Sequence, residues 1–292
     1  MTTGIFCCIL NLINEREVDM RYRLIASDFD GTIYRSDFRI ADGTREAIAD
    51  YRRAGGTFMV STGRLYESIS KQLPDLGLDD GAVIVEQGAG IVDIRTGETI
   101  LSYEIDNDIA VRCMERIESD SELIGLIYDG GRCYAESSSV YTETFASIIK
   151  VDIHYVGIPM SRYMRENGIS PTKLLALVSP DKDKIFVSEY GALYEELSFA
   201  MSAPYLMEVV TKDAGKGNAL RYVAENIYHI PREDIIAMGD ADNDISMIEY
   251  AGLGIAMGNA MDSVKAVADM VADTNDNSGV AKIIREYGIG EL

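Results

Sequence analysis

The chain has 292 residues, more than one hydrophobic core usually holds, so its length predicts two domains. Hydrophobic residues make up 47% and charged residues 26%, which is the composition of a globular protein with a substantial buried interior. The formal net charge of −21 argues against a nucleic-acid partner, and it means that any phosphate site needs positive charge supplied locally.

The N-terminal segment is assigned no role. Residues 1–19 include a short apolar run that has no basic segment before it and is too short to cross a bilayer, so neither a signal nor an anchor is predicted. The four cysteines have neither zinc-site spacing nor the density of a disulfide scaffold. A cytoplasmic protein without a membrane partner is therefore predicted, and its oligomeric state is left open.

Short apolar strands alternate with amphipathic helices from residue 22 to about residue 90. This alternation predicts the beginning of a doubly wound, Rossmann-like parallel sheet, whose ligands lie outside the carboxyl ends of its strands. The predicted elements are a strand ending at Asp28, a helix over 44–54, a strand over 57–60, a helix over 65–73 and a third strand over 82–85.

The pattern changes at about residue 91, and residues 91–208 are interpreted as an α+β domain inserted into the first one. The expected elements there are strands at 125–128, at 174–178 and as a pair near 197–210, with helices near 107–118, 141–149 and 182–194. From residue 209 the first pattern returns, with a helix over 216–228, strands at 235–238, 254–258 and 270–272, and helices near 260–268 and from 279. The sequence therefore predicts a core of 20–90 and 209–292 with an inserted cap of 91–208.

Two carboxylates follow the first strand, in the segment 28–32 with the sequence Asp-Phe-Asp-Gly-Thr. Residues i and i+2 of an extended chain point the same way, so Asp28 and Asp30 are expected to face one substrate. Two like charges so close need a cation between them or a shared proton. Asp28 could then attack phosphorus as a nucleophile while Asp30 exchanges a proton with the leaving and entering oxygens.

Polar groups also follow two other predicted strands. Ser61 and Thr62 follow the strand at 57–60, and a third cluster containing Asp240 follows the strand at 235–238. Carboxylates from separate strands supply the hard oxygen ligands that Mg²⁺ prefers. Phosphate oxygens could be bound by the Thr62 hydroxyl, the Gly63 amide and a helix beginning at Arg64, with Lys216 as the fixed positive charge.

These segments resemble the phosphatases of the Cof type in the haloacid dehalogenase superfamily. The matching segments are 28–32, 61–64 (Ser-Thr-Gly-Arg), 215–217 (Gly-Lys-Gly) and 239–244, and the resemblance covers the chain from about residue 22 to its end. It implies a cap domain and an aspartyl-phosphate intermediate on Asp28, with Asp30 as general acid and then base. One departure is Gln87, where the family usually has asparagine before Gly-Ala.

The resemblance also implies roles for the remaining site residues. Thr62, Gly63 and Lys216 hold the transferred phosphoryl group, with Asn243 nearby. Mg²⁺ is bound by the Asp28 carboxylate, the Asp30 backbone carbonyl and Asp240. Asp244 and Arg64 support the site without binding the metal.

The resulting expectation is a Mg²⁺-dependent phosphatase that hydrolyses small phosphomonoesters, such as sugar phosphates or related metabolites. Two alternatives stay open at this point. A phosphomutase of the phosphomannomutase type would return the phosphoryl group to a sugar, and a non-catalytic phospho-receiver or binding protein would share the acidic cluster, hydroxyl, lysine and Mg²⁺. The identity of the phosphorylated partner depends on side chains of the cap, which the motifs do not specify.

Overall fold

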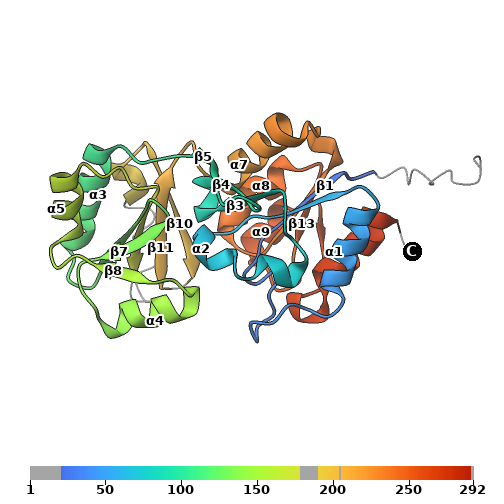
Figure 1. The fold of residues 1–292 in the computed structure, drawn as a ribbon, viewed down its shortest axis with the longest axis horizontal. Coiled ribbons are helices and arrows are strands. Elements are labelled where there is room, and N and C mark those ends of the chain that lie inside the picture. Colours follow the sequence, from blue (N-terminus) through green and yellow to red (C-terminus); the bar gives the residue numbers. More distant parts are fainter. Residues whose placement is uncertain (1–20, 178–189, 204, 291–292) are drawn as a thin grey trace, which may run out of the picture.

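The computed structural model of the chain describes residues 21–177, 190–203 and 205–290. They form two lobes, one built around a parallel sheet and one around a second sheet (Figure 1). The predicted N-terminal extension lies outside the described residues, and so does most of the helix expected at 182–194. Within the described part of the chain, no helix has the length and hydrophobicity needed to cross a membrane.

Five parallel strands form the core sheet, in the order β14-β13-β12-β1-β2. The predicted doubly wound α/β core is confirmed. Its strands are β1 (Leu24–Ser27), β2 (Thr57–Val60), β12 (Ile235–Gly239), β13 (Leu253–Ala256) and β14 (Met270–Val271).

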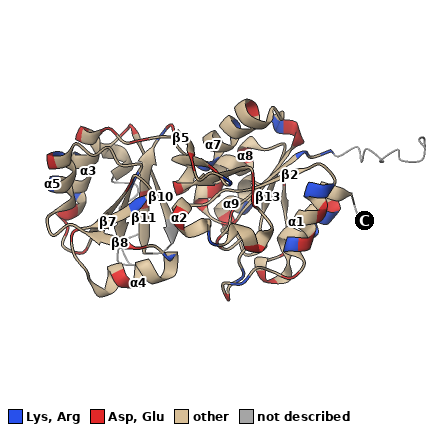
Figure 2. Cartoon of the chain, in the orientation of Figure 1, with Lys and Arg blue, Asp and Glu red and all other residues tan. Residues whose placement is uncertain are grey.

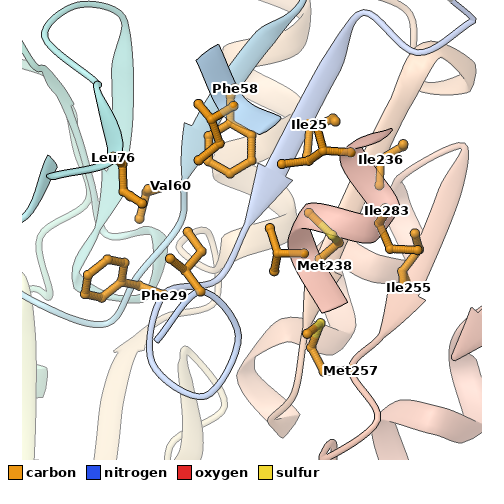
Figure 3. Close-up of a cluster of buried hydrophobic side chains, with 14 of the residues drawn as sticks. Ile25, Phe29, Phe58, Val60, Leu76, Ile236, Met238, Ile255, Met257 and Ile283 are labelled. Carbon is orange, nitrogen blue, oxygen red and sulfur yellow. The ribbon is translucent and has the colours of Figure 1, made fainter. Parts of the chain in front are cut away.

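Both faces of this sheet are covered, which explains why its strands are apolar at most positions, with Ser27 and Thr57 as the polar exceptions in β1 and β2. Leu24 and Ala26 pack into one hydrophobic cluster, while Ile25 between them packs into the other. Ile25 lies beside Phe58 of β2 and Ile236 of β12, its partners in the register (Figure 3). The covering helices are α1 (Thr44–Arg53), α7 (Lys216–Tyr222), α8 (Ile245–Tyr250), α9 (Asp262–Val267) and α10 (Gly279–Ile283). Figure 2 shows acidic and basic residues together on α1, which buries only its apolar side.

The third predicted strand is present, but it does not continue the parallel sheet. β3 (Ala82–Val85) pairs antiparallel with β4 (Gly90–Asp93), and β4 pairs with β5 (Thr99–Ser102). A single parallel bridge between Ser61 and Ile84 links β3 to the end of β2. The turn at Glu86 and Gln87, with φ values of 55° and 63°, reverses the chain directly after β3 and so brings β4 antiparallel to it.

This hairpin also bears on the predicted boundary at residue 90. Ile91 and Val92 pack into the two hydrophobic clusters of the core sheet, not into those of the second lobe. We therefore propose that the change from core to cap lies after Ser102 and not at the predicted boundary.

The cap lobe contains a six-stranded sheet in the order β10-β11-β9-β6-β7-β8. Helices α3 (Asn107–Glu118) and α5 (Met160–Asn167) pack in the hydrophobic cluster on one face, whereas α4 (Val140–Ile149) packs on the other. Leu65 of the core joins this second cluster, so that face of the cap sheet is turned toward the core. The strands are β6 (Ile124–Asp129), β7 (Arg132–Ala135), β8 (Ile153–Tyr155), β9 (Lys173–Leu177), β10 (Leu197–Ala203) and β11 (Leu206–Thr211).

The helix predicted over 65–73 is divided. α2 (Tyr66–Ile69) is a single turn, and a separate 3-10 helix follows over Leu73–Leu76. Pro74 has no N–H to donate to an earlier carbonyl, so an α-helix does not continue through it. The expected phosphate-binding helix beginning at Arg64 is therefore too short to supply a substantial helix dipole.

Candidate active site

Three adjacent strands bring the predicted residues to one edge of the core sheet. β12, β1 and β2 are neighbours in the sheet and run parallel. Asp28 follows β1, Thr62 lies just beyond β2 and Asp240 follows β12. The Asp28 N–H donates to the Met238 carbonyl at 2.9 Å, which keeps the chain in register as it leaves the strand. Motifs that are far apart in the sequence therefore meet where open parallel sheets bind ligands.

Lys216 is a buried cation at the carboxyl end of these three strands. Its side chain is fully buried, and Nζ donates to Asp28 Oδ1 and to Asp244 Oδ1, both at 2.6 Å. Burial opposes the charged form, but the carboxylates of Asp244 and Asp28 outweigh this effect and raise the pKa of Lys216 above its usual range. Lys216 is therefore a permanent positive charge that links two acidic segments of the core.

Asp244 is a scaffold residue in this geometry. One carboxylate oxygen accepts from Lys216, and Oδ2 accepts from the backbone N–H groups of Asp240 at 2.9 Å and Ala241 at 3.1 Å. Asp244 is completely buried. Its bonds hold the loop after β12, and with it the Asp240 side chain, in place.

The acidic cluster fits a divalent cation. Carboxylate oxygens of Asp28, Asp240 and Asp244 lie within 4.8 Å of one another. Burial is the largest effect on both Asp28 and Asp240: it raises the pKa of Asp28 well above its usual range, and burial with the Asp244 charge raises the pKa of Asp240 to about 7. Lys216 alone does not compensate this concentration of carboxylates. Because Asp244 is engaged on both oxygens, Asp28 and Asp240 are the residues that would hold the cation.

Gly31 allows the segment after β1 to approach Asp240. A Cβ at this position would lie 2.4 Å from Asp240 Oδ2, and φ is +83°. Thr32, the next residue, donates from Oγ1 to Asp240 Oδ1 at 3.1 Å. Glycine is required here both by the close approach and by the left-handed backbone.

Asp30 lies at the same end of the core sheet as Asp28, but its hydrogen-bond partner is different. Arg64 donates from Nε to Asp30 Oδ2 at 2.7 Å and from Nη2 to Oδ1 at 2.5 Å. The Asp30 side chain is 46% exposed, whereas Arg64 is buried and lies over the rings of Phe29 and Tyr34. The two carboxylates predicted to face one substrate thus line one cavity, with Asp28 held by Lys216 and Asp30 by Arg64.

The other residues predicted to bind phosphate lie at the same end of the core sheet as Asp28 and Asp30. Thr62 is buried, and its Oγ1 accepts from the Arg64 N–H at 3.2 Å, which leaves the hydroxyl proton available to an oxygen of a ligand. Gly63 and Asn243 line the cavity with Asp28. Asn243 Nδ2 donates to Gln87 Oε1 at 2.8 Å.

The cavity has a volume of about 310 Å³ and lies between the core and the cap. The core side presents the polar groups described above. The cap side is mostly aromatic and aliphatic, with Tyr128, Phe145, Ile148, Tyr205 and Leu206. A phosphate ester could therefore place its phosphoryl group against the core and its leaving group against the cap.

The sequence interpretation missed three residues at this junction. Gln87 was recognised only as a departure from a family pattern, and Lys173 and Glu208 of the cap were not considered as site residues. All three are buried beside the cavity or its loops. The available signal was a lysine at the start of an otherwise apolar strand and a glutamate inside another.

Comparison with known proteins gives a consistent assignment. The family model described as haloacid dehalogenase-like hydrolase matches residues 25–284. The putative phosphatase YxeH of Bacillus subtilis is 26% identical over 91% of this chain and 98% of its own length. The 5-amino-6-(5-phospho-D-ribitylamino)uracil phosphatase YwtE of the same organism is 29% identical over 92% of this chain and 99% of its own. A crystal structure of a haloacid dehalogenase-like hydrolase from Bacteroides thetaiotaomicron has a TM-score of 0.76, with 29% identity over 91% of this chain and 99% of that one.

Loss of the buried cation should destabilise the core. We expect Lys216→Met to lower the free energy of unfolding in EDTA by about 3–5 kcal/mol, because it leaves the Asp28 and Asp244 carboxylates buried without their partner. Urea unfolding followed by circular dichroism measures this change. Lys282→Met, which removes an exposed ion pair with Asp273, is the control and should have a far smaller effect. Equal effects of the two substitutions would contradict the role given to Lys216.

Metal binding should depend on pH through Asp240. Its folded pKa of about 7 lies above the ordinary value of 3.8, so the stability that this group contributes is present at low pH and is lost as pH rises through about 7. Mg²⁺ favours the ionised carboxylates and should reverse this loss. We therefore expect the increase in melting temperature caused by Mg²⁺, relative to EDTA, to grow between about pH 5 and about pH 8.

Thermal unfolding across that pH range measures the effect, with Asp240→Asn as the control in which the pH dependence should weaken. An increase of the same size at every pH in the unsubstituted protein would argue against this metal site.

Proposed function

Since the chain belongs to the haloacid dehalogenase-like hydrolases and is a phosphatase, we propose that it hydrolyses small phosphomonoesters with Mg²⁺ through an aspartyl-phosphate intermediate. The observation that carries this proposal is that Lys216 lies between Asp28 and Asp244, and that Asp28 lines a cavity. A buried cation, a carboxylate nucleophile and a second acid meet there. This combination suits the transfer of a phosphoryl group to Asp28.

The proposed metal ligands are the carboxylates of Asp28 and Asp240 and the backbone carbonyl of Asp30. Mg²⁺ would supply charge neutralisation and polarisation of the phosphoryl oxygens. Lys216 neutralises part of the same negative charge through its contact with Asp28. At an effective dielectric constant near ~20, a unit charge ~4 Å from a phosphate oxygen contributes about 4 kcal/mol before desolvation.

In the first step, a carboxylate oxygen of Asp28 forms a bond to phosphorus while the bond from phosphorus to the ester oxygen breaks. Asp30 gives its proton to the leaving oxygen, which departs as an alcohol. In the second step, Asp30 takes a proton from water as the water oxygen attacks phosphorus, and Asp28 is released with inorganic phosphate. In this structure Arg64 holds both carboxylate oxygens of Asp30, which orients the carboxylate that takes the proton from water, and one of these two bonds gives way when Asp30 carries the proton.

The phosphoryl oxygens are proposed to be held by the Thr62 hydroxyl, the Gly63 N–H and the Asn243 side chain. These groups come from two loops on either side of Asp28. Donors that are already in place before the reaction stabilise the charge that develops in the transition state.

The cavity restricts the leaving group. Its volume of 310 Å³ is at the lower end of the usual range for small-molecule sites, about 300–1,000 Å³, so we propose small metabolites such as sugar phosphates as substrates. The aromatic side chains of the cap wall also suit a ring. Because the relative YwtE is named for a phosphorylated ribitylaminouracil, that class of compound belongs in the substrate screen.

We also propose a cytoplasmic location. Cys113 and Cys133 are free, buried thiols, and burial raises the pKa of each to about 12. They behave as small apolar residues of the cap core. Free thiols of this kind suit a reducing compartment.

The nucleophile can be tested directly. Asp28→Asn should abolish essentially all hydrolysis of phosphomonoesters, because the amide does not form the acyl phosphate, while part of the Mg²⁺ affinity should remain through Asp240. Phosphate release measures the first property and isothermal titration with Mg²⁺ measures the second. Turnover close to that of the unsubstituted protein would exclude an intermediate on Asp28.

The reaction class can be tested with a screen of phosphorylated metabolites in Mg²⁺ and in EDTA. We expect inorganic phosphate to be released only with Mg²⁺, and Asp30→Asn to lower turnover by about 10²–10⁴-fold, because general acid–base catalysis is lost. An isomerised sugar phosphate without released phosphate would instead indicate a phosphomutase. Binding without multiple turnovers would indicate a phospho-receiver or a binding protein.

A further inference from the structure

A buried ion pair of the cap lies directly behind the phosphate-binding loops of the core. Lys173 on β9 is fully buried and pairs with Glu208 on the adjacent strand β11, which is itself 5% exposed. Lys173 also lies over the ring of Tyr128, with Nζ 5.2 Å from its centroid. None of these cap residues belongs to the acidic cluster at Asp28.

Lys173 reaches across to the first phosphate-binding loop. Its Nζ donates to the Gly63 carbonyl at 3.0 Å. The same peptide group carries the Arg64 N–H, which donates to Thr62 Oγ1 at 3.2 Å. By holding the oxygen end of this peptide, Lys173 sets the direction of the N–H at its other end. That N–H in turn holds the Thr62 hydroxyl oxygen, next to Gly63, which lines the cavity.

Glu208 reaches the second loop through Gln87. Gln87 Nε2 donates to Glu208 Oε2, and Gln87 Oε1 accepts from Asn243 Nδ2 at 2.8 Å. Asn243 is thereby fixed by a residue of the core that is itself fixed by the cap. Gln87 also packs against the first loop, because a Cβ on Gly63 would lie 2.5 Å from its Nε2.

We propose that the Lys173–Glu208 ion pair is a positioning device that holds both phosphate-binding loops, at Thr62 and at Asn243, in the geometry that receives the phosphoryl group. This inference rests on the proposed function, because it assumes that these two residues contact phosphate. The position of the cap on the core and the affinity for phosphate are then coupled, because Lys173 and Glu208 contribute to both.

A purely structural role explains these contacts less well. Burying two opposite charges is rarely better for stability than burying apolar residues of similar volume. Here each charged side chain carries a polar bond out of the cap, and the two bonds end on separate loops of the core. In metal sites, partners that orient the ligating side chains typically change affinity or activity by about 10–100-fold when they are removed, and we expect an effect of this size for the phosphate-binding loops.

The test uses the double substitution Lys173→Met with Glu208→Gln. It removes both charges together, so no single buried charge is left without a partner, and residue 208 still accepts from Gln87. The expected result is a melting temperature close to that of the unsubstituted protein, with the KM for p-nitrophenyl phosphate and the inhibition constant of inorganic phosphate both raised about 10–100-fold in saturating Mg²⁺. The matched control is Arg165→Met with Glu115→Gln, which removes an exposed cap ion pair and should leave both constants unchanged.

If the double variant has the same melting temperature, KM and inhibition constant as the unsubstituted protein, the ion pair has no positioning role and the proposal is overturned. If the double variant does not fold, Gln87→Met gives the decision. It keeps the ion pair but removes both hydrogen bonds that link Glu208 to Asn243, so both constants should still rise, and unchanged constants overturn the proposal.

Failure of the proposed function has a different signature. If the unsubstituted protein neither hydrolyses p-nitrophenyl phosphate nor binds inorganic phosphate in Mg²⁺, the proposed function and this inference both fall. If the unsubstituted protein is active and the variants are equally active, only the positioning role falls.

Discussion

The structure of the site depends on one buried cation, Lys216, placed between carboxylates that would otherwise repel one another. Asp28 and Asp244 each contribute an oxygen 2.6 Å from its Nζ, although they lie in segments separated by more than two hundred residues. Asp244 then uses its second oxygen to hold the backbone at Asp240. The contact between Lys216 and Asp244 therefore also fixes where the Asp240 carboxylate lies. Lys216 neutralises only part of the negative charge of the three carboxylates, and a divalent cation would neutralise the rest.

The parallel sheet makes this arrangement possible. β1 lies between β12 and β2 and runs parallel to both, so the loops after all three strands meet at the carboxyl end of the sheet. Helix α7 begins at Lys216 and packs on α8, which follows the loop containing Asp244. At Gly217 a Cβ would lie 2.4 Å from the Ser246 carbonyl oxygen, so the helices approach too closely for any other residue. The glycine after the lysine is therefore a packing requirement that puts the cation in place.

This part of the molecule could be predicted from the sequence because each element carries a local signal. Asp28 and Asp240 directly follow apolar strands, and Lys216 opens a helix, so the order of the elements was enough to bring them together. The hairpin after β3 could not be predicted in this way, because Glu86 and Gln87 adopt positive φ without being glycine. The contacts of Lys173 and Glu208 were also hidden. Their partners lie on other strands and in the other lobe, and strand pairing between distant segments leaves no local pattern.

The two lobes differ in which of them holds the acidic cluster and its buried cation. The acidic cluster and Lys216 belong entirely to the core, so side chains of the cap wall can change without disturbing them. The cap is nevertheless more than a cover, because its sheet meets Leu65 in a shared hydrophobic cluster and Lys173 binds the Gly63 carbonyl. A cap that only enclosed the substrate would need the hydrophobic contact with Leu65 but not the hydrogen bond from Lys173 to Gly63. The hydrogen bond from Lys173 joins a charged group of the cap to the peptide between Gly63 and Arg64, whose N–H donates to Thr62 Oγ1, so the cap sheet and the loop after β2 are held together by a polar contact as well as by packing.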